Sequence, residues 1–412
     1  MKKISKSSVS RSALVFCFLL SFSAAKAQQL DSYILEAQQN NPDIQANELR
    51  YNLAEERVNE VNSLPNTEIS AGYFVSEPET RTGAQKARFS VKQMIPWFGT
   101  ITARENYAGA MADAEYVEIA IAKRKLALNV AQTYYNLYAL REKQEVLQQN
   151  IKLLDTYEEL ALTSVQVDKA SAVDVLKLQM RQNELQEQIE VLQQDEESAR
   201  VIFSNLLNRE NVETISIVDS LFLPEEEKIG QNELKIHPEL LKFDRLYESV
   251  TQSEKVNLRE ASPQIGVGLD YIPVEERPEM SFNDNGKDII MPMVSVSIPI
   301  FSKKYNSVSA QNELRLQEIN SQKQERFNML KTQLQTATSN RNSARISYNT
   351  QLKNLKQAND AEEILLKNYE TGTIDFNDVL DIQELQLKFE IKLIDAVTKY
   401  YRETANINYL TN

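Results

Sequence analysis

Two aspartates near the C-terminus have the spacing of a carboxylate pair on one helical face. Asp378 and Asp381 lie three residues apart, soon after Gly372, so their side chains point the same way if this segment is helical. Several copies of such a pair around a pore would attract cations. Acidic residues in the first turn of a helix also stabilise its N-terminus without any further role. Both interpretations fit the residues alone.

Other reactive residue types are sparse, which argues against an enzyme. His237 is the only histidine and Cys17 the only cysteine, so the sequence offers no zinc-ligand set. It also lacks a Ser-His-Asp order and a glycine-rich phosphate loop. We therefore predict no enzymatic activity, no catalytic or metal-binding residues and no cofactor. Thioethers suit Cu(I) but more often fill space in apolar surroundings, and three of them precede the long helices predicted below: Met94, Met291 and Met293.

The first 27 residues have the pattern of a secretory signal peptide. A basic start precedes an apolar run over residues 13–22 and a small-residue cleavage site before Gln28. The run is too short to span a bilayer. Cys17 lies inside this run, after Phe16, which does not fit a lipoprotein signal. The exported chain would therefore contain no cysteine, and packing alone would stabilise it.

The charge of the chain excludes several classes of partner. The sequence has 46 Lys and Arg against 59 Asp and Glu, and five of the basic residues lie in the signal peptide, so the exported chain carries a net charge of −18. This charge argues against nucleic acid or an anionic lipid surface as a partner. After the signal peptide no stretch of 18 apolar residues occurs, so we predict no transmembrane helix.

The sequence contains one pattern twice. Asp174-Val175-Leu176 returns as Asp378-Val379-Leu380 at an offset of 204, and the segment 93–99 returns as 296–302 at an offset of 203. This period is far too long for a solenoid. We predict two structural repeats after the signal peptide, over residues 28–225 and 226–412.

Each repeat is predicted to contain a long helix followed by a shorter one. Gly and Pro are absent from residues 110–223 and 303–371, where good helix formers predominate. Apolar residues recur there in steps of four and three, the period of a coiled coil. We predict long helices over about 100–166 and 303–369, with tip turns at about 167–172 and 370–374. Four polar residues interrupt the apolar seams: Gln144, Glu158, Arg341 and Glu362.

A pair of strands precedes each long helix. Apolar and polar residues alternate along all four segments, at lengths typical of membrane strands. We predict strands at about 66–75, 86–95, 263–272 and 290–299, with turn-rich loops over Ser76–Gln85 and Pro273–Asp288. Soluble hairpins packed on helices are the alternative.

Four strands in a membrane force an assembly. They cannot close a barrel, and an open sheet edge in lipid leaves backbone groups unpaired. Three copies related by cyclic symmetry would supply twelve strands and close the ring.

Three segments resemble the TolC family of outer-membrane efflux proteins. Residues 369–381, YETGTIDFNDVLD, are similar to the family's turn at the periplasmic tip, and residues 167–176, VDKASAVDVL, repeat it with Asp168 where a glycine is usual. Residues 93–99, QMIPWFG, resemble a strand-to-helix segment of the metal and drug branches. The likeness implies a mainly α fold with a membrane β-barrel portion. In it, a duplicated helix–strand–strand–long helix–helix unit forms a homotrimer, with a twelve-stranded barrel on a long α-helical barrel.

The resemblance also implies roles for single residues. Asp378 and Asp381 match carboxylate rings at the narrow periplasmic end, Asp174 a gate-locking aspartate and Tyr369 a gate-bracing tyrosine. Gly372 lies in the tip turn, where a tight conformation suits glycine. The basic partner of the gate-locking aspartate falls at Ile374, so the charged latch of the family is absent or made by other residues. Trp97 fits a membrane-interface anchor, with core packing as the alternative.

The function implied is that of an exit duct. Family members reside in the outer membrane, with helices in the periplasm, and dock onto a periplasmic adaptor and an inner-membrane transporter of the RND or ABC type. We therefore predict a tripartite efflux channel for small molecules or metal ions. An exit duct for secreted polypeptides and a soluble periplasmic coiled-coil scaffold are the alternatives.

Overall fold

The computed structural model describes residues 29–166, 171–211, 215–224, 237–301, 303–370, 373–374 and 376–411. The predicted signal peptide lies outside the described residues, as do residues 167–170 and 371–372 of the predicted tip turns, Gly372 among them. After a first helix over 29–40, the elements follow in this order: α2 Pro42–Val61, β1 Glu68–Tyr73, β2 Glu79–Thr80, β3 Gly83–Gln85, β4 Ala87–Ile95, α3 Thr100–Gln166, α4 Ala172–Leu206, α5 Pro238–Glu260, β5 Gln264–Ile272, β6 Val274–Glu275, β7 Ile289–Ser297, α6 Lys303–Glu370 and α7 Phe376–Thr411.

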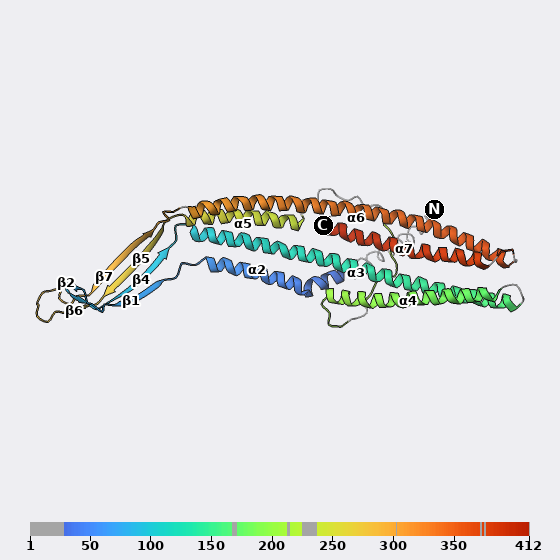
Figure 1. Cartoon of the computed structure of the whole chain (residues 1–412), viewed down its shortest axis with the longest axis horizontal. Coiled ribbons are helices and arrows are strands. Elements are labelled where there is room, and N and C mark those ends of the chain that lie inside the picture. The colour runs from blue at the N-terminus through green and yellow to red at the C-terminus, as the bar shows by residue number, and fades with distance from the viewer. Residues whose placement is uncertain are drawn as a thin grey trace, which may run out of the picture. The chain divides into compact units, whose positions relative to one another are not determined.

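The element order confirms a duplicated arrangement of helix, strands, long helix and helix (Figure 1). The helices α3 and α6 occupy the stretches without Gly or Pro, and α3 has the predicted bounds. Proline opens α2 and α5 at their first helical position, where its missing N–H has no helical partner to lose. The Oδ1 of Asn41 accepts the backbone N–H of Asp43 at 3.0 Å and so caps α2.

The chain divides into two compact units that cut across the predicted repeats. The strand unit comprises residues 46–119 and 238–326, and the helical unit comprises the described residues within 1–45, 120–237 and 327–412. Each unit takes segments from both halves of the sequence. The strand unit contains both halves because the strands of one half of the sequence pair with those of the other.

The main sheet of the strand unit is antiparallel, in the order β1-β4-β5-β7. The central pair β4–β5 joins the two halves of the sequence and sets Phe89 opposite Tyr271 and Val91 opposite Leu269. Because side chains alternate along a strand, these apolar residues share one face of the sheet. Ser90 lies opposite Asp270 on the other face. The predicted alternation therefore describes two chemically different faces.

The loops between the strands contain structure that the sequence pattern did not predict. β2, β3 and β6 form a second, three-stranded sheet. Ion pairs reinforce it: Arg81 reaches Asp284 at 2.8 Å, and Lys86 contacts both Glu77, at 2.7 Å, and Glu275. Strands of two or three residues are too short to show a periodic pattern.

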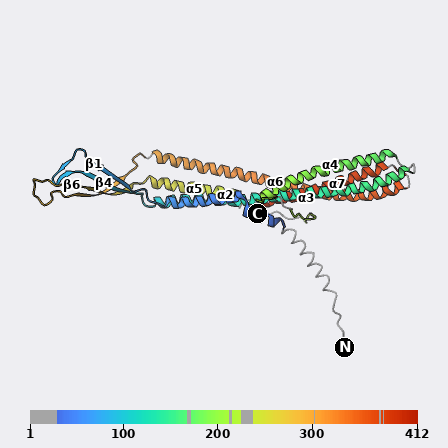
Figure 2. The same cartoon turned by 90° about the horizontal axis from the view of Figure 1, so that it is seen from below.

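The helical unit contains two apolar clusters. In one, Tyr33, Tyr134 and Phe203 pack around each other, with a T-shaped contact of 5.1 Å between the rings of Tyr33 and Phe203. The other cluster holds the ends of α3, α4, α6 and α7. Figure 2 shows the last turns of α3 and α6 and the first turns of α4 and α7 at the same end of this unit.

Candidate functional site at the helix ends

The four helix ends share one buried apolar cluster, which fixes the residues around them. Leu154 of α3, Leu178 of α4 and Val379 of α7 are almost completely buried in it, and Leu365 of α6 packs against it. A hydrophobic contact among four helices positions the polar side chains that project from the same turns.

Asp378 and Asp381 project away from this cluster. Both are exposed on α7, whereas Val379 between them is fully buried. Among the described residues no hydrogen bond or ion pair reaches either carboxylate, so neither is neutralised within the chain. Glu384 extends the exposed row at the same spacing of three residues, and the sequence analysis missed it.

Asp174 occupies a local structural position. The backbone N–H of Ser171 donates to its Oδ2 at 3.2 Å, and the Ser171 hydroxyl accepts from the N–H of Val173, also at 3.2 Å. This reciprocal pair is a capping box at the start of α4. The carboxylate that the resemblance assigns to a gate lock therefore already caps its own helix.

Tyr369 and Ile374 both pack against the apolar cluster. At the end of α6, the carbonyl of Asn368 accepts from the N–H of Thr373 at 3.0 Å and from its hydroxyl at 2.8 Å. These two hydrogen bonds terminate the helix. The side chain at position 374 is thus an apolar contact where the family resemblance would place a basic partner. One polar contact joins the two helix pairs here, from the Lys177 Nζ to the Asn377 Oδ1 at 2.8 Å.

A buried polar network lies a few turns behind the tip. The Tyr157 hydroxyl donates to Glu362 Oε1 at 2.9 Å, and the amides of Gln383 and Gln386 donate to the same carboxylate at 3.0 and 2.7 Å. Tyr157, Gln383 and Gln386 are each more than nine-tenths buried. The network joins α3 of the first helix pair to α6 and α7 of the second.

Burial and charge shape the titration of this network. Burial, followed by the nearby Glu362 carboxylate, raises the pKa of the Tyr157 hydroxyl, which therefore stays protonated as a donor. Burial also raises the pKa of Glu390, one turn beyond Gln386, and Glu362 raises it further. Ionisation of Glu390 is therefore disfavoured beside this network.

In the sequence, the sign of this network was that Glu362 interrupts the apolar seam of the long helix. The other interruptions also have partners: Gln144 donates to Glu196 at 2.9 Å, and the guanidinium of Arg341 lies 5.7 Å from the centre of the Tyr400 ring. Glu158 accepts from Gln179 at 2.7 Å. A polar residue in an apolar seam thus marked a specific contact at each of the four positions.

Trp97, the predicted membrane-interface anchor, lies between β4 and α3. It is half-buried and makes a T-shaped contact of 5.8 Å with Phe98, which is 79% exposed. Gly99 has a φ of 78°, a conformation that lets the chain turn sharply into α3. The anchor role of Trp97 stays a prediction.

Two kinds of feature are absent from the described residues. No group of three His, Cys, Asp or Glu side chains could hold a metal ion there. Within the described part of the chain, no helix has a stretch long and apolar enough to cross a membrane.

The family and the solved structures that this chain resembles are all outer membrane proteins. Residues 33–209 match the family described as "Outer membrane efflux protein". No curated protein gave a significant match to the sequence. Among solved structures, the outer membrane protein VceC of Vibrio cholerae is 14% identical, with a TM-score of 0.74 over 93% of this chain and 96% of that one. The open-state MtrE outer membrane channel of Neisseria gonorrhoeae is 16% identical, with a TM-score of 0.74 over 93% and 88%.

The chain therefore shares the fold of solved outer-membrane channel protomers. The fold is that of TolC-like outer membrane channels, and residues 33–209 match the sequence pattern of the outer membrane efflux protein family.

Proposed function

We propose that this chain is the outer-membrane exit duct of a tripartite efflux system, passing small molecules or metal ions to the outside. The observation that carries the proposal is an uncovered apolar face on the main sheet. Ile69 and Val294 on that face are 79% and 77% exposed, and Val267 between them is 43% exposed. A water-soluble sheet would bury such a face, whereas lipid covers it in a membrane strand.

A shared barrel follows from the edges of the same sheet. β1 and β7 are the edge strands and have no further partner among the described residues. Unpaired strand edges are costly in lipid, so edge β1 of one copy would pair with edge β7 of the next. Three copies close a twelve-stranded barrel, and Trp97 would anchor its periplasmic rim.

The helix ends supply the gate in this proposal. Copies of Asp378 and Asp381 around the axis concentrate uncompensated negative charge and favour cations. The family likeness assigns Tyr369 and Gly372 to the tip turn, and Asp174 caps the start of α4. Because Ile374 brings no charge, the Glu362 network is the better-supported link between the two helix pairs.

The remaining partners belong to the same proposal. The family likeness supports a periplasmic adaptor and an inner-membrane transporter of the RND or ABC type as the other components. The cleaved signal peptide over residues 1–27 would export the chain, and outer-membrane lipid would surround the sheet.

Cysteine labelling of intact cells tests the topology. We expect Thr82→Cys and Asn283→Cys, in the loop segments, to react with an impermeant maleimide in intact cells. The matched control Asn183→Cys, on the exposed face of α4, should react only after outer-membrane rupture. Labelling of all three positions only after rupture would place the loops in the periplasm and refute the exit duct.

A further inference from the structure

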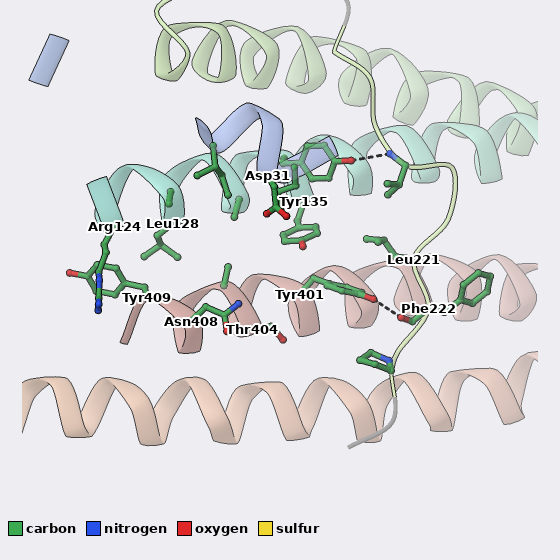
Figure 3. Close-up of a pocket in the computed structure, with 18 of the residues that line it drawn as sticks. Asp31, Arg124, Leu128, Tyr135, Leu221, Phe222, Tyr401, Thr404, Asn408 and Tyr409 are labelled. Atoms are coloured by element: carbon green, nitrogen blue, oxygen red, sulfur yellow. Dashed lines mark hydrogen bonds between the residues drawn. The ribbon is translucent and has the colours of Figure 1, made fainter. Parts of the chain in front are cut away.

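A cavity of about 1080 Å³ lies in the helical unit, apart from the candidate gate (Figure 3). Its walls come from the helix over 29–40, from α3 at 124–135, from the segment 218–224 and from α7 at 401–409. About 45 Å of helix separates Tyr135 from the end of α3. The proposed exit-duct function makes no use of this cavity.

Tyrosine hydroxyls fix the wall formed by residues 216–222. Each hydroxyl binds a backbone group of this segment. The pairs are Tyr33 with the Ser216 N–H at 3.0 Å, Tyr134 with the Val218 N–H at 3.0 Å, Tyr138 with the Leu221 N–H at 3.2 Å, and Tyr401 with the Phe222 carbonyl at 2.6 Å. A segment held at four points cannot easily collapse inward, so the cavity is pre-formed.

Tyr135 differs from these four tyrosines. Its ring packs on Tyr401 with centroids 5.2 Å apart, and burial raises the pKa of its hydroxyl. Among the described residues, however, no hydrogen bond reaches this hydroxyl, which points into the cavity in Figure 3. Tyr135 is half-buried, so its hydroxyl is a donor that an acceptor entering the cavity could engage.

The lining indicates the class of ligand. The lining is mainly apolar and aromatic. Its charged groups, Asp31 and Arg124, are of opposite sign, so it favours a ligand without net charge. The volume slightly exceeds the range of about 300–1000 Å³ that is typical of ligand pockets, so a drug-sized molecule fits. We propose that this cavity binds an uncharged, largely apolar aromatic molecule whose hydrogen-bond acceptor faces the Tyr135 hydroxyl.

A matched pair of probes tests the proposal. Flavone is planar and aromatic and has a carbonyl acceptor, whereas 2-phenylnaphthalene has nearly the same shape without one. In a Cys17→Ser background, Thr404→Cys places a thiol in the cavity wall, and Arg402→Cys places one on the exposed face of the same helix. The rate of modification by a small methanethiosulfonate is measured in lipid nanodiscs, with and without each probe.

We expect both probes to slow modification of Thr404→Cys and neither to affect Arg402→Cys. Flavone should act at concentrations about two- to tenfold lower, the value of one neutral hydrogen bond. Tyr135→Phe should abolish the difference between the two probes and leave protection by 2-phenylnaphthalene intact. If the substitution only damaged the cavity, protection by both probes would be lost.

Three outcomes would overturn the proposal. A Thr404→Cys thiol that does not react in folded protein would mean that the cavity is closed or filled. Fast modification without protection by either probe would mean that it binds no aromatic ligand. An unchanged flavone advantage in Tyr135→Phe would remove that hydroxyl from the site. Melting curves of each variant establish that the protein is folded.

Discussion

At the scale of residues, position decides what each carboxylate does. Asp174, Glu362 and Asp378 are all acidic residues near the helix ends, yet their surroundings differ. The first caps a helix by accepting from one backbone N–H, the second accepts three side-chain hydrogen bonds, and the third is exposed without a partner among the described residues. Only an uncompensated charge of the third kind can act on ions at a distance.

The Tyr157–Glu362 hydrogen bond should hold the two helix pairs together. Tyr157→Phe removes one donor from a buried carboxylate, and we expect a loss of about 1 kcal/mol in the local free energy of opening. Hydrogen exchange measured by mass spectrometry across the adjoining turns of α3 and α7 would report it.

A double-mutant cycle with Glu362→Gln separates this bond from general packing. The two substitutions should be less than additive, since each removes the charge-assisted hydrogen bond between these side chains. Additive effects would show that the hydrogen bond contributes nothing.

At the scale of elements, the packing of α7 makes one carboxyl sensitive to pH. Burial and Glu362 raise the pKa of Glu390 in the folded chain above its ordinary value of 4.5. The folded state then binds a proton more tightly than the unfolded state. The stabilisation from this group is full at low pH and is lost as the pH rises through the raised pKa.

Glu390→Gln should therefore stabilise the protein at neutral pH. We expect a higher melting temperature than that of the unsubstituted chain at pH 7.5, and a difference that shrinks toward pH 4. The control Glu384→Gln, on the exposed face of the same helix, should show no such trend. A pH-independent difference for Glu390→Gln would contradict the burial argument.

The elements also show what the sequence could predict. The bounds of α3 followed from the absence of Gly and Pro and from the apolar period, because both are local signals. The sheet order β1-β4-β5-β7 and the short strands β2, β3 and β6 depend on pairing between distant segments, which leaves no local pattern. The contact between Glu362 and Tyr157 was visible only as a polar interruption, without its partner.

At the scale of the whole molecule, the account requires several copies. A four-stranded sheet with two free edges and an uncovered apolar face is incomplete as a monomer in lipid. Native mass spectrometry of protein purified in mild detergent should give the mass of a trimer. A monomer that persists at every detergent concentration would exclude the shared barrel.

Ion selectivity in planar bilayers tests the exit duct most directly. The purified protein should form channels that prefer cations, because up to six carboxylates from Asp378 and Asp381 would surround the axis of a trimer. Asp378→Asn with Asp381→Asn should shift the reversal potential toward zero and weaken block by multivalent cations. The control Asp195→Asn with Glu197→Gln, which removes two exposed acids of α4, should leave both unchanged. Well-folded protein that forms no channels would contradict the duct itself, and unchanged selectivity in the tip variant would remove these aspartates from the pore.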